Sequence, residues 1–394
     1  MKLNQWTLGL AAVGMVSLGG VARAEEAAVP LMTALSSTTI SGYVDASAHW
    51  NLGTGTGYNY YKFGGSSKAD GFNLNVVQLS IAKPLDEADW AAGYKVDLWF
   101  GPDANSLGTQ STLSTGSGDF AIRQAYVALR APVGNGLDFK VGVFDTILGY
   151  ESIESGNNPN YTRSYAFTFQ PQTHTGVLAT YRFCECFSAA VGVANTVGAQ
   201  INERAFVDGT KAESYKTYMG SIALTAPESW GFLSGSTLYA GVVNGFNDGA
   251  TLAQGGLNGD GNQTSWYVGA TMATPVTGLK LGAAWDLLDF HSDSGNQSLG
   301  DAWAASVYAS FQATEKLSLH ARGEMAQINS GRYFGTDNIQ IWSLTGTVQY
   351  DLWKNVISRA EVRWDHGDEN QYFSSANGSL KNVVLLAANI IYKF

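Results

Sequence analysis

The sequence predicts an all-β protein: a transmembrane, antiparallel up-and-down β-barrel of about sixteen strands, with short periplasmic turns and long external loops. Three observations predict this fold class. Segments of about ten residues alternate between apolar and polar side chains, which is the length and period of a tilted membrane-spanning strand. The connections between these segments alternate between short and long. Aromatic residues gather at both ends of the segments.

The chain begins with an export signal. Lys2 supplies a positive charge, residues 8–21 are mostly apolar, and Ala22-Arg23-Ala24 has the small-x-small form of a cleavage site. A buried N-terminal helix is the alternative, but it would not need a cleavage pattern. The predicted organisation is a signal peptide over residues 1–24, a periplasmic lead over 25–37 and an outer-membrane barrel over 38–394.

The composition fits strands that are half polar. Charged residues make up 14% of the chain, against about 25% in an average protein. Glycine occurs 46 times and aromatic residues reach 12%. Beyond the signal, no run approaches the 18 apolar residues of a membrane-spanning helix. The net charge of −10 and the lack of Lys/Arg clusters argue against a nucleic-acid partner.

The first predicted strand shows the alternation clearly. Val44, Ala46 and Ala48 share one face, while Asp45 and Ser47 share the other. A soluble sandwich would alternate as well, but its strands usually have about five or six residues. The predicted strands are residues 38–50, 72–83, 90–100, 120–130, 137–144, 174–183, 187–195, 215–225, 237–244, 265–273, 279–287, 302–312, 317–326, 339–350, 356–365 and 381–394.

The second and fourth strands alternate poorly. Val76 and Val77 are adjacent, and Arg123 and Gln124 would face opposite sides, so β-bulges are expected in both strands. The connections nevertheless separate cleanly by length. Short ones include residues 84–89, 184–186, 274–278, 313–316 and 351–355, and long ones include 51–71, 101–119, 145–173, 196–214, 245–264 and 366–380.

Aromatic residues mark two boundaries. Tyr and Trp collect where membrane meets water, because part of the ring is apolar and part can form hydrogen bonds. Phe394 ends the last strand, with Tyr392 two positions earlier, which is similar to the terminal signature that the outer-membrane assembly machinery recognises. Lipid and this machinery are therefore expected partners. The predicted girdles contain Trp50, Trp266, Trp285, Trp303 and Trp364 at the long-loop end, and Trp90, Tyr392 and Phe394 at the other.

Three motifs carry a family resemblance. They are Gly-Val-Phe-Asp-Thr-Ile-Leu-Gly-Tyr-Glu at residues 142–151, Asn-Asn-Pro-Asn-Tyr-Thr-Arg-Ser-Tyr at 157–165, and His-Thr-Gly-Val at 174–177. Together they resemble the OmpL-like β-barrel porin family of Gram-negative bacteria. The resemblance implies an outer-membrane channel for small hydrophilic solutes and ions, and it supplies no family-defined site residue. It also implies that residues 145–173, after the fifth strand, fold inward as a constriction, and that a homotrimer is the common assembly.

Charges on the polar faces predict how such a channel selects. Arg322, Arg359 and Arg363 share the lumen phase and form a basic wall, which would set up a transverse field against acidic residues of the long loop. The alternative is that these ions pair with one another. Arg163 is expected to bind a lumen carboxylate such as Asp97. The candidate loop residues are Asp145, Glu151, Glu154, Tyr161 and Arg163; the remaining lumen charges are Asp45, Lys95, Asp97, Glu324 and Glu361.

Rival functions have weaker support. Enzyme motifs such as Gly-x-Ser-x-Gly, the P-loop and His-Glu-x-x-His do not occur, although Ser318 and His320 on one strand face could belong to a barrel hydrolase. A closed structural or surface-binding barrel, of the adhesin or phage-receptor type, is the main alternative. Neither a cofactor nor a metal is expected, because residues 255–263 lack the spacing of a calcium loop.

The two cysteines lie only two positions apart. A disulfide between Cys184 and Cys186 would need a tight, strained turn, and a metal site would want further ligands nearby. We interpret the pair as a turn that can hold a local disulfide, and we assign it no function.

Overall fold

The computed structural model describes residues 37–53, 68–107, 109, 118–207, 210–246, 261–291, 298–329, 338–368, 373–375 and 378–394. The predicted signal peptide and all but the last residue of the predicted lead lie outside these ranges. Within the described ranges, no α-helix is both long and apolar enough to cross a membrane.

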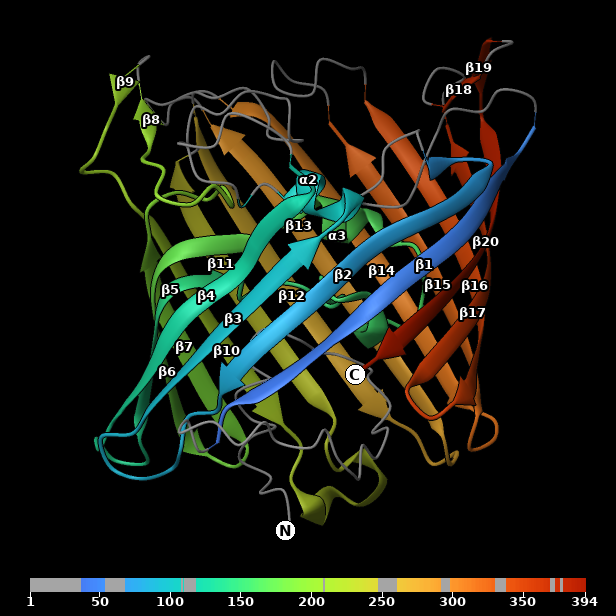
Figure 1. The fold of residues 1–394 in the computed structure, drawn as a ribbon. Helices are drawn as coiled ribbons and strands as arrows, with labels where there is room; N and C mark the ends of the chain where they lie inside the picture. Colours follow the sequence, from blue (N-terminus) through green and yellow to red (C-terminus); the bar gives the residue numbers. More distant parts are fainter. Residues whose placement is uncertain are drawn as a thin grey trace.

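Sixteen antiparallel strands form a closed barrel, as predicted (Figure 1). Each barrel strand pairs with the next barrel strand along the chain, and β1 pairs with β20 to close the barrel. The barrel strands are β1 Thr39–Leu52, β2 Gly71–Lys83, β3 Ala92–Phe100, β4 Phe120–Ala131, β5 Leu137–Asp145, β6 Thr173–Cys184, β7 Phe187–Ala194, β10 Thr217–Thr225, β11 Thr237–Phe246, β12 Asn262–Ala273, β13 Leu279–His291, β14 Ser298–Gln312, β15 Leu317–Ile328, β16 Ile339–Trp353, β17 Val356–Gly367 and β20 Asn382–Lys393.

The remaining elements lie in the connections. Two small hairpins pair β8 (Phe206–Val207) with β9 (Thr210–Lys211) and β18 (Phe373–Ser375) with β19 (Gly378–Leu380). The helical pieces are α2 (Pro102–Leu107), η2 (Ser155–Asn157), α3 (Tyr165–Phe169) and η3 (Glu228–Leu233). Figure 1 shows α3 within the outline of the barrel.

Both predicted bulges are confirmed. The register of β1 with β2 skips Asn75, and the register of β3 with β4 skips Arg123. A bulge rotates the side chains on one side of it by half a period. Arg123 and Gln124 are consequently both buried, which corrects the expectation that they face opposite sides.

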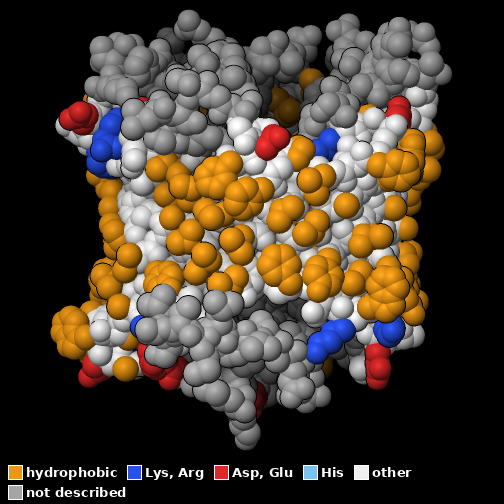
Figure 2. Space-filling view, in the orientation of Figure 1, with side chains coloured by type: hydrophobic (Ala, Val, Ile, Leu, Met, Phe, Trp, Pro, Cys, Tyr) orange, Lys and Arg blue, Asp and Glu red, His pale blue; other side chains and the backbone are white. Residues whose placement is uncertain are grey.

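The outer face of the barrel is apolar. Figure 2 shows hydrophobic side chains over the middle of one face, with charged side chains at its upper and lower margins. The predicted girdle residues all lie on the surface: Trp303 is half-buried, and Trp50, Trp266, Trp285, Trp364, Trp90, Tyr392 and Phe394 are exposed. Phe394 also exchanges two backbone hydrogen bonds of 3.0 Å with Gly42 of β1, so the chain end takes part in closing the barrel.

The inner face is partly apolar as well, although barrel lumens are usually polar. One cluster of buried side chains includes Leu288, Ile341 and Leu385, from β13, β16 and β20. A second cluster includes Leu178 and Tyr239, from β6 and β11. Such surfaces need an apolar cover, and the connection between β5 and β6 provides it.

Candidate functional site

Residues 145–173, here called the lumen loop, lie inside the barrel and are described throughout. Local hydrogen bonds set their fold. The Ser164 side chain caps α3 by accepting from the Phe167 N–H at 3.1 Å. The Asn158 amide group accepts from the Ser152 N–H and donates to the Ser152 carbonyl, both at 2.7 Å. The loop therefore has a defined structure of its own.

Arg163 braces the loop from within. Its guanidinium donates to the backbone carbonyls of Ser152, Tyr161 and Ile153 at 3.0–3.2 Å. The expectation that Arg163 binds Asp97 is therefore wrong. A planar group with five N–H donors suits three carbonyls that converge from two stretches of the loop, residues 152–153 and residue 161.

The first part of the loop packs on the wall from β6 to β14. The Tyr150 ring stacks on Tyr308 with 4.0 Å between centroids, and its hydroxyl oxygen lies where a Cβ on Gly282 would come within 1.8 Å. Tyr239 donates from its hydroxyl to the Ile147 carbonyl at 2.6 Å. Glycine at position 282 thus leaves the space that the Tyr150 side chain fills.

The middle of the loop crosses to β15, β16 and β17, where buried ions bind its backbone. Arg322 donates to Glu151 at 2.8 Å and to the Thr162 carbonyl at 2.9 Å. Glu361 accepts from the N–H groups of Tyr161 and Thr162 at 2.6 and 3.0 Å. Glu324 accepts from the Tyr165 N–H at 2.8 Å.

These ions also pair with one another. Arg322 and Arg363 both lie 3.3 Å from Glu324, and Arg363 lies 2.9 Å from Asp365. Arg322 and Arg363 are 0% and 1% exposed. Because water does not reach these two guanidinium groups, solutes in the lumen do not reach them either.

The far end of the crossing contacts the first and last strands. The Tyr161 hydroxyl donates to Ser47 of β1 at 2.9 Å and lies 3.2 Å from His49 Nδ1. Lys393 of β20 donates to the Gly156 carbonyl at 3.1 Å. Burial raises the pKa of Tyr161 well above its usual value, so its hydroxyl keeps the proton that it donates.

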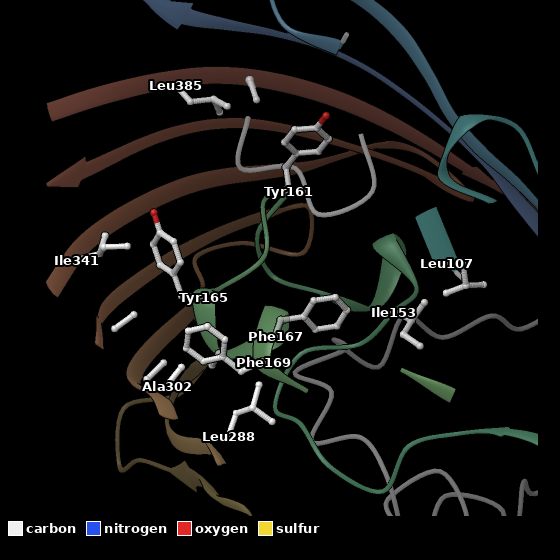
Figure 3. Close-up of a cluster of buried hydrophobic side chains, with 14 of the residues drawn as sticks. Leu107, Ile153, Tyr161, Tyr165, Phe167, Phe169, Leu288, Ala302, Ile341 and Leu385 are labelled. Carbon is white, nitrogen blue, oxygen red and sulfur yellow. The ribbon is translucent and has the colours of Figure 1, made fainter. Parts of the chain in front are cut away.

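An apolar layer covers the wall beyond this crossing. Figure 3 shows Tyr165, Phe167 and Phe169 of the loop lying among side chains of the strands. Phe169 lies beside Leu288 and Ala302 in that view, and all three belong to one buried cluster. Burying an aromatic side chain contributes roughly 1.5–3 kcal/mol, so this layer is a substantial anchor.

Arg123, which the sequence analysis did not select, connects the loop to β3 and β4. Its guanidinium lies 2.5 Å from Asp97, 2.6 Å from Asp145 and 3.2 Å from Glu154. Asp145 and Glu154 thus bind β4, whereas they were predicted to face Arg322, Arg359 and Arg363 across the lumen. Only Glu151 of the three acidic loop residues pairs with that wall. The poor alternation around Arg123 was the signal that could have identified it.

Partly exposed charges remain between the loop and the inner face of β3 to β5. Lys95, Asp145 and Glu154 have side chains that are 29%, 21% and 18% exposed. Lys95 lies 3.0 Å from Asp97. Lys140 is half-buried, and its ammonium group lies 5.0 Å from the centre of the Tyr126 ring.

Two predicted charges sit deeper. Asp45 is buried and accepts from the side-chain amides of Asn75 and Asn389, each at 3.2 Å. Arg359 is buried and donates to the Ser155 carbonyl at 3.1 Å and to Gln349 at 3.0 Å. Both groups therefore support the barrel seam and the loop.

The rival sites gain no support from these contacts. Ser318 donates to Gln312 at 2.9 Å, and His320 lies 2.9 Å from Ser310. Across the part of the chain that the structure describes, no group of three or more His, Cys, Asp or Glu side chains could hold a metal ion. Cys184 and Cys186 are free thiols, so the local disulfide is absent from this structure.

A closed sixteen-strand barrel with an apolar outer face, short turns at one end and long loops at the other defines an outer-membrane β-barrel protein. Residues 37–394 match the model of one family, described as "Putative beta-barrel porin-2, OmpL-like". The chain belongs to this family, and it is an outer-membrane porin of a Gram-negative bacterium. Membership places it among channels rather than enzymes.

Solved porin structures share the fold at low identity. An anion-selective porin from Comamonas acidovorans is 12% identical with a TM-score of 0.61, over 91% of this chain and 99% of that one. The outer-membrane channel DcaP of Acinetobacter baumannii is 15% identical with a TM-score of 0.57, over 91% and 97%. OmpT of Vibrio cholerae in its trimer form is 14% identical with a TM-score of 0.57, over 91% and 99%. A comparison with curated proteins finds no match.

Proposed function

We propose that this porin is a passive diffusion channel for small hydrophilic solutes and ions, and that the lumen loop is its constriction. The observation that carries the proposal is that the loop crosses the lumen and is bonded to both sides of it. Arg123 of β4 holds one side, and Arg322 of β15 holds the other. A segment fixed at both ends across a barrel narrows whatever passage remains.

We place the remaining passage along the inner face of β3 to β5. Tyr150 and α3 cover the wall from β13 to β15, and the segment from Gly156 to Tyr161 covers the wall toward β20. Lys95 and Lys140 keep partial exposure on the third wall. The polar, partly exposed surface is the one that a hydrated solute can follow.

This passage has opposite charges on its two sides. Lys95 and Lys140 extend from the barrel wall, Glu154 lies on the loop side, and Asp145 lies at the end of β5 where the loop begins. Unit charges about 4 Å apart interact by about 1 kcal/mol in water, and more strongly in a narrow pore. The sequence predicted a transverse field from Arg322, Arg359 and Arg363. We propose that the field instead lies along the inner face of β3 to β5, where it would orient dipolar solutes.

Conductance of the refolded protein in planar bilayers tests the proposal. Stable conductance steps are expected from the intact chain, and deletion of residues 157–165 should raise their size. A chain with no steps would remove the channel function. Steps of unchanged size after the deletion would keep the channel and show that the loop does not limit it.

The outer surface of the barrel indicates the partners of the chain. We propose contact with outer-membrane lipid through the exposed aromatic side chains, and recognition by the assembly machinery through Phe394, which is exposed at the barrel seam. A homotrimer is the proposed assembly, supported by the trimer form of the Vibrio OmpT structure. Native mass spectrometry of protein extracted in mild detergent gives the subunit number, and a single-chain mass would contradict the trimer.

One observation favours a second candidate function. Two apolar clusters and a buried ion network lie between the loop and the inner face of the barrel. A closed barrel whose external loops bind a surface or a phage would be built in this way. The absence of conductance from correctly folded protein would select this alternative.

A further inference from the structure

Four buried oxygen atoms surround Ala284 on the inner face of β13, and none of them has a hydrogen-bond partner among the described residues. They are Oδ2 of Asp286 and the hydroxyl oxygens of Tyr150, Tyr267 and Ser306, here called the oxygen cage. Buried polar groups are nearly always paired with protein or with ordered solvent. Four unpaired oxygens at one place therefore point to a bound group.

The strand register places these oxygens around Ala284. Ala284 pairs with Gly269 of β12 on one side and with Ser306 of β14 on the other. Asp286 and Gly282 are the next inward-facing residues of β13 in the two directions along the strand. Neighbouring strands lie about 4.8 Å apart, and alternate residues of one strand lie about 6.8 Å apart. All four neighbours of Ala284 are thus close enough for their side chains to meet above it.

Two of these neighbours are glycines, and a tyrosine hydroxyl occupies the space above each. A Cβ on Gly269 would come within 1.9 Å of the Tyr267 hydroxyl oxygen, and a Cβ on Gly282 within 1.8 Å of the Tyr150 hydroxyl oxygen. The two hydroxyls therefore lie over two of the four positions around Ala284. Because alanine carries only a methyl group, its own side chain does not fill the centre.

The lumen loop closes the oxygen cage from inside the barrel. Gln170 donates to Oδ1 of Asp286 at 2.5 Å, which leaves Oδ2 for another partner. Tyr150 belongs to the loop, and its ring is held against Tyr308 of β14. Asp286 and Tyr267 are 2% and 1% exposed. A group bound here would be held between the loop and the barrel wall, away from bulk water.

Asp286 has no positive partner in the part of the chain that the structure describes. Its printed contact is with the neutral amide of Gln170. Arg322 and Arg363, on β15 and β17, are bound to Glu151 and Glu324 at 2.8–3.3 Å. A buried carboxylate is costly unless it is paired or coordinates a cation. The charge of Asp286 therefore favours a cation as the bound group.

We propose that the oxygen cage binds one monovalent hard cation of the sodium or potassium class. Hard cations prefer carboxylate, hydroxyl and water oxygens as ligands. One carboxylate balances one positive charge, whereas Ca²⁺ takes about six to eight oxygen ligands. The described residues contain no group of three or more His, Cys, Asp or Glu side chains that could hold a metal ion. The bound cation would join Tyr150 of the lumen loop to Asp286 of β13 and so stabilise the position of the loop.

The test is thermal unfolding of the full-length protein refolded in detergent. Sodium chloride and potassium chloride are compared with N-methyl-D-glucamine chloride at the same ionic strength, because that cation is too large for the oxygen cage. A ligand that binds only the folded state raises the midpoint. We expect the wild-type midpoint to be higher in sodium or potassium chloride by about 2 °C or more.

Two variants separate the site from a general salt effect. Asp286→Asn keeps the shape of the side chain but removes its charge, so its midpoint should not depend on the cation. Asp289→Asn changes a partly exposed carboxylate on the same strand and should keep the wild-type dependence. Ser306→Ala removes one ligand, so it should need a higher sodium concentration for the same rise in midpoint.

Equal wild-type midpoints in all three salts would show that only water binds to these oxygens. A dependence on the cation that persists in Asp286→Asn would place the ion elsewhere. If Asp286→Asn does not fold, Ser306→Ala decides, and an unchanged sodium dependence in that variant would overturn the site. The midpoint is read without any measurement of conductance, so the result is independent of the proposed channel function.

Discussion

The charged side chains on two walls of the lumen serve two different purposes. On β15 to β17, Arg322, Glu324 and Arg363 are sealed beneath the loop and bind its backbone. On β3 to β5, Arg123 is also buried and binds two carboxylates of the loop, whereas Lys95 and Lys140 remain partly exposed and bind no part of the loop's backbone in the described contacts. In the sequence both sets share the same alternating pattern. The comparison shows that an inward-facing charge in a barrel can serve as scaffold, and only its exposure separates it from a charge that meets solutes.

The largest effect should come from breaking the sealed wall. Arg322→Ala leaves Glu151 and Glu324 buried without their shared cation. Removing one partner of a buried ion pair typically costs about 3–5 kcal/mol. We expect a loss of that size in the free energy of unfolding, measured by urea titration of the refolded protein, together with larger conductance steps. Lys280→Ala is the matched control. Lys280 lies on β13 and is exposed, so its removal should change the free energy of unfolding little.

If Arg322→Ala costs no more than the Lys280 control, the buried wall does not anchor the loop. The two walls would then be equivalent, and the comparison between them would fail.

A smaller effect should follow from filling the space beside Tyr150. In Gly282→Ala, the new Cβ would lie 1.8 Å from the Tyr150 hydroxyl oxygen and 2.5 Å from its Cζ, so the ring must move. Overpacking of this kind costs about 1–3 kcal/mol. Thermal unfolding should show the loss. Gly346→Ala places its Cβ 3.9 Å from Val362, an ordinary contact, and should show none. Equal midpoints for the two variants would mean that the loop does not press on β13.

Tyr161→Phe tests the contact at the barrel seam. Loss of the hydrogen bond to Ser47 should cost about 0.5–1.5 kcal/mol near neutral pH. Burial raises the pKa of Tyr161 in the folded chain, so its contribution to stability is complete below about pH 10, the unfolded value, and falls as the pH rises above it. Wild type and variant should therefore converge in stability at alkaline pH. A stability difference between wild type and Tyr161→Phe that stays constant across that pH range would contradict the role of the Tyr161 hydroxyl as a buried donor.

The smallest effect on stability and the clearest effect on ion selectivity are expected from changes on the inner face of β3 to β5. Lys140→Glu should change the free energy of unfolding less than Arg322→Ala, because Lys140 is only half-buried and has no ion pair among the described contacts. It should shift the reversal potential in a salt gradient toward cations. Lys381→Glu makes the same charge change at an exposed residue directly before β20, and it should leave that potential unchanged. Identical potentials for both variants would place the passage elsewhere.

The fold was largely predictable because lipid imposes it. A strand that faces lipid on one side must alternate, and this fixed segments such as β11, predicted at 237–244 and found at Thr237–Phe246. The inward apolar surface was less evident, yet the last strand gave a signal. Leu385, Ala387 and Ile391 lie on its second face, and an apolar inward face requires a cover.

The site was only partly predictable for two physical reasons. A single bulge reverses the facing of a side chain, so Arg123 could not be placed inward from alternation alone. Contacts such as Arg322 with Glu151 join residues 171 positions apart, and they exist only once the barrel is closed. Arg163 was predicted in the right loop but with the wrong partner. Its three acceptors are backbone carbonyls from two separate stretches of the folded loop, which side-chain patterns do not reveal.

The contacts of the lumen loop with Ser47 and Lys393 constrain the order of assembly. Ser47 belongs to the first strand and Lys393 to the last, and these strands form the seam. The loop can hold both only after the two ends of the sheet have met. Complete seating of the loop therefore requires closure of the barrel, and a chain whose loop is misplaced would be left with a weaker seam.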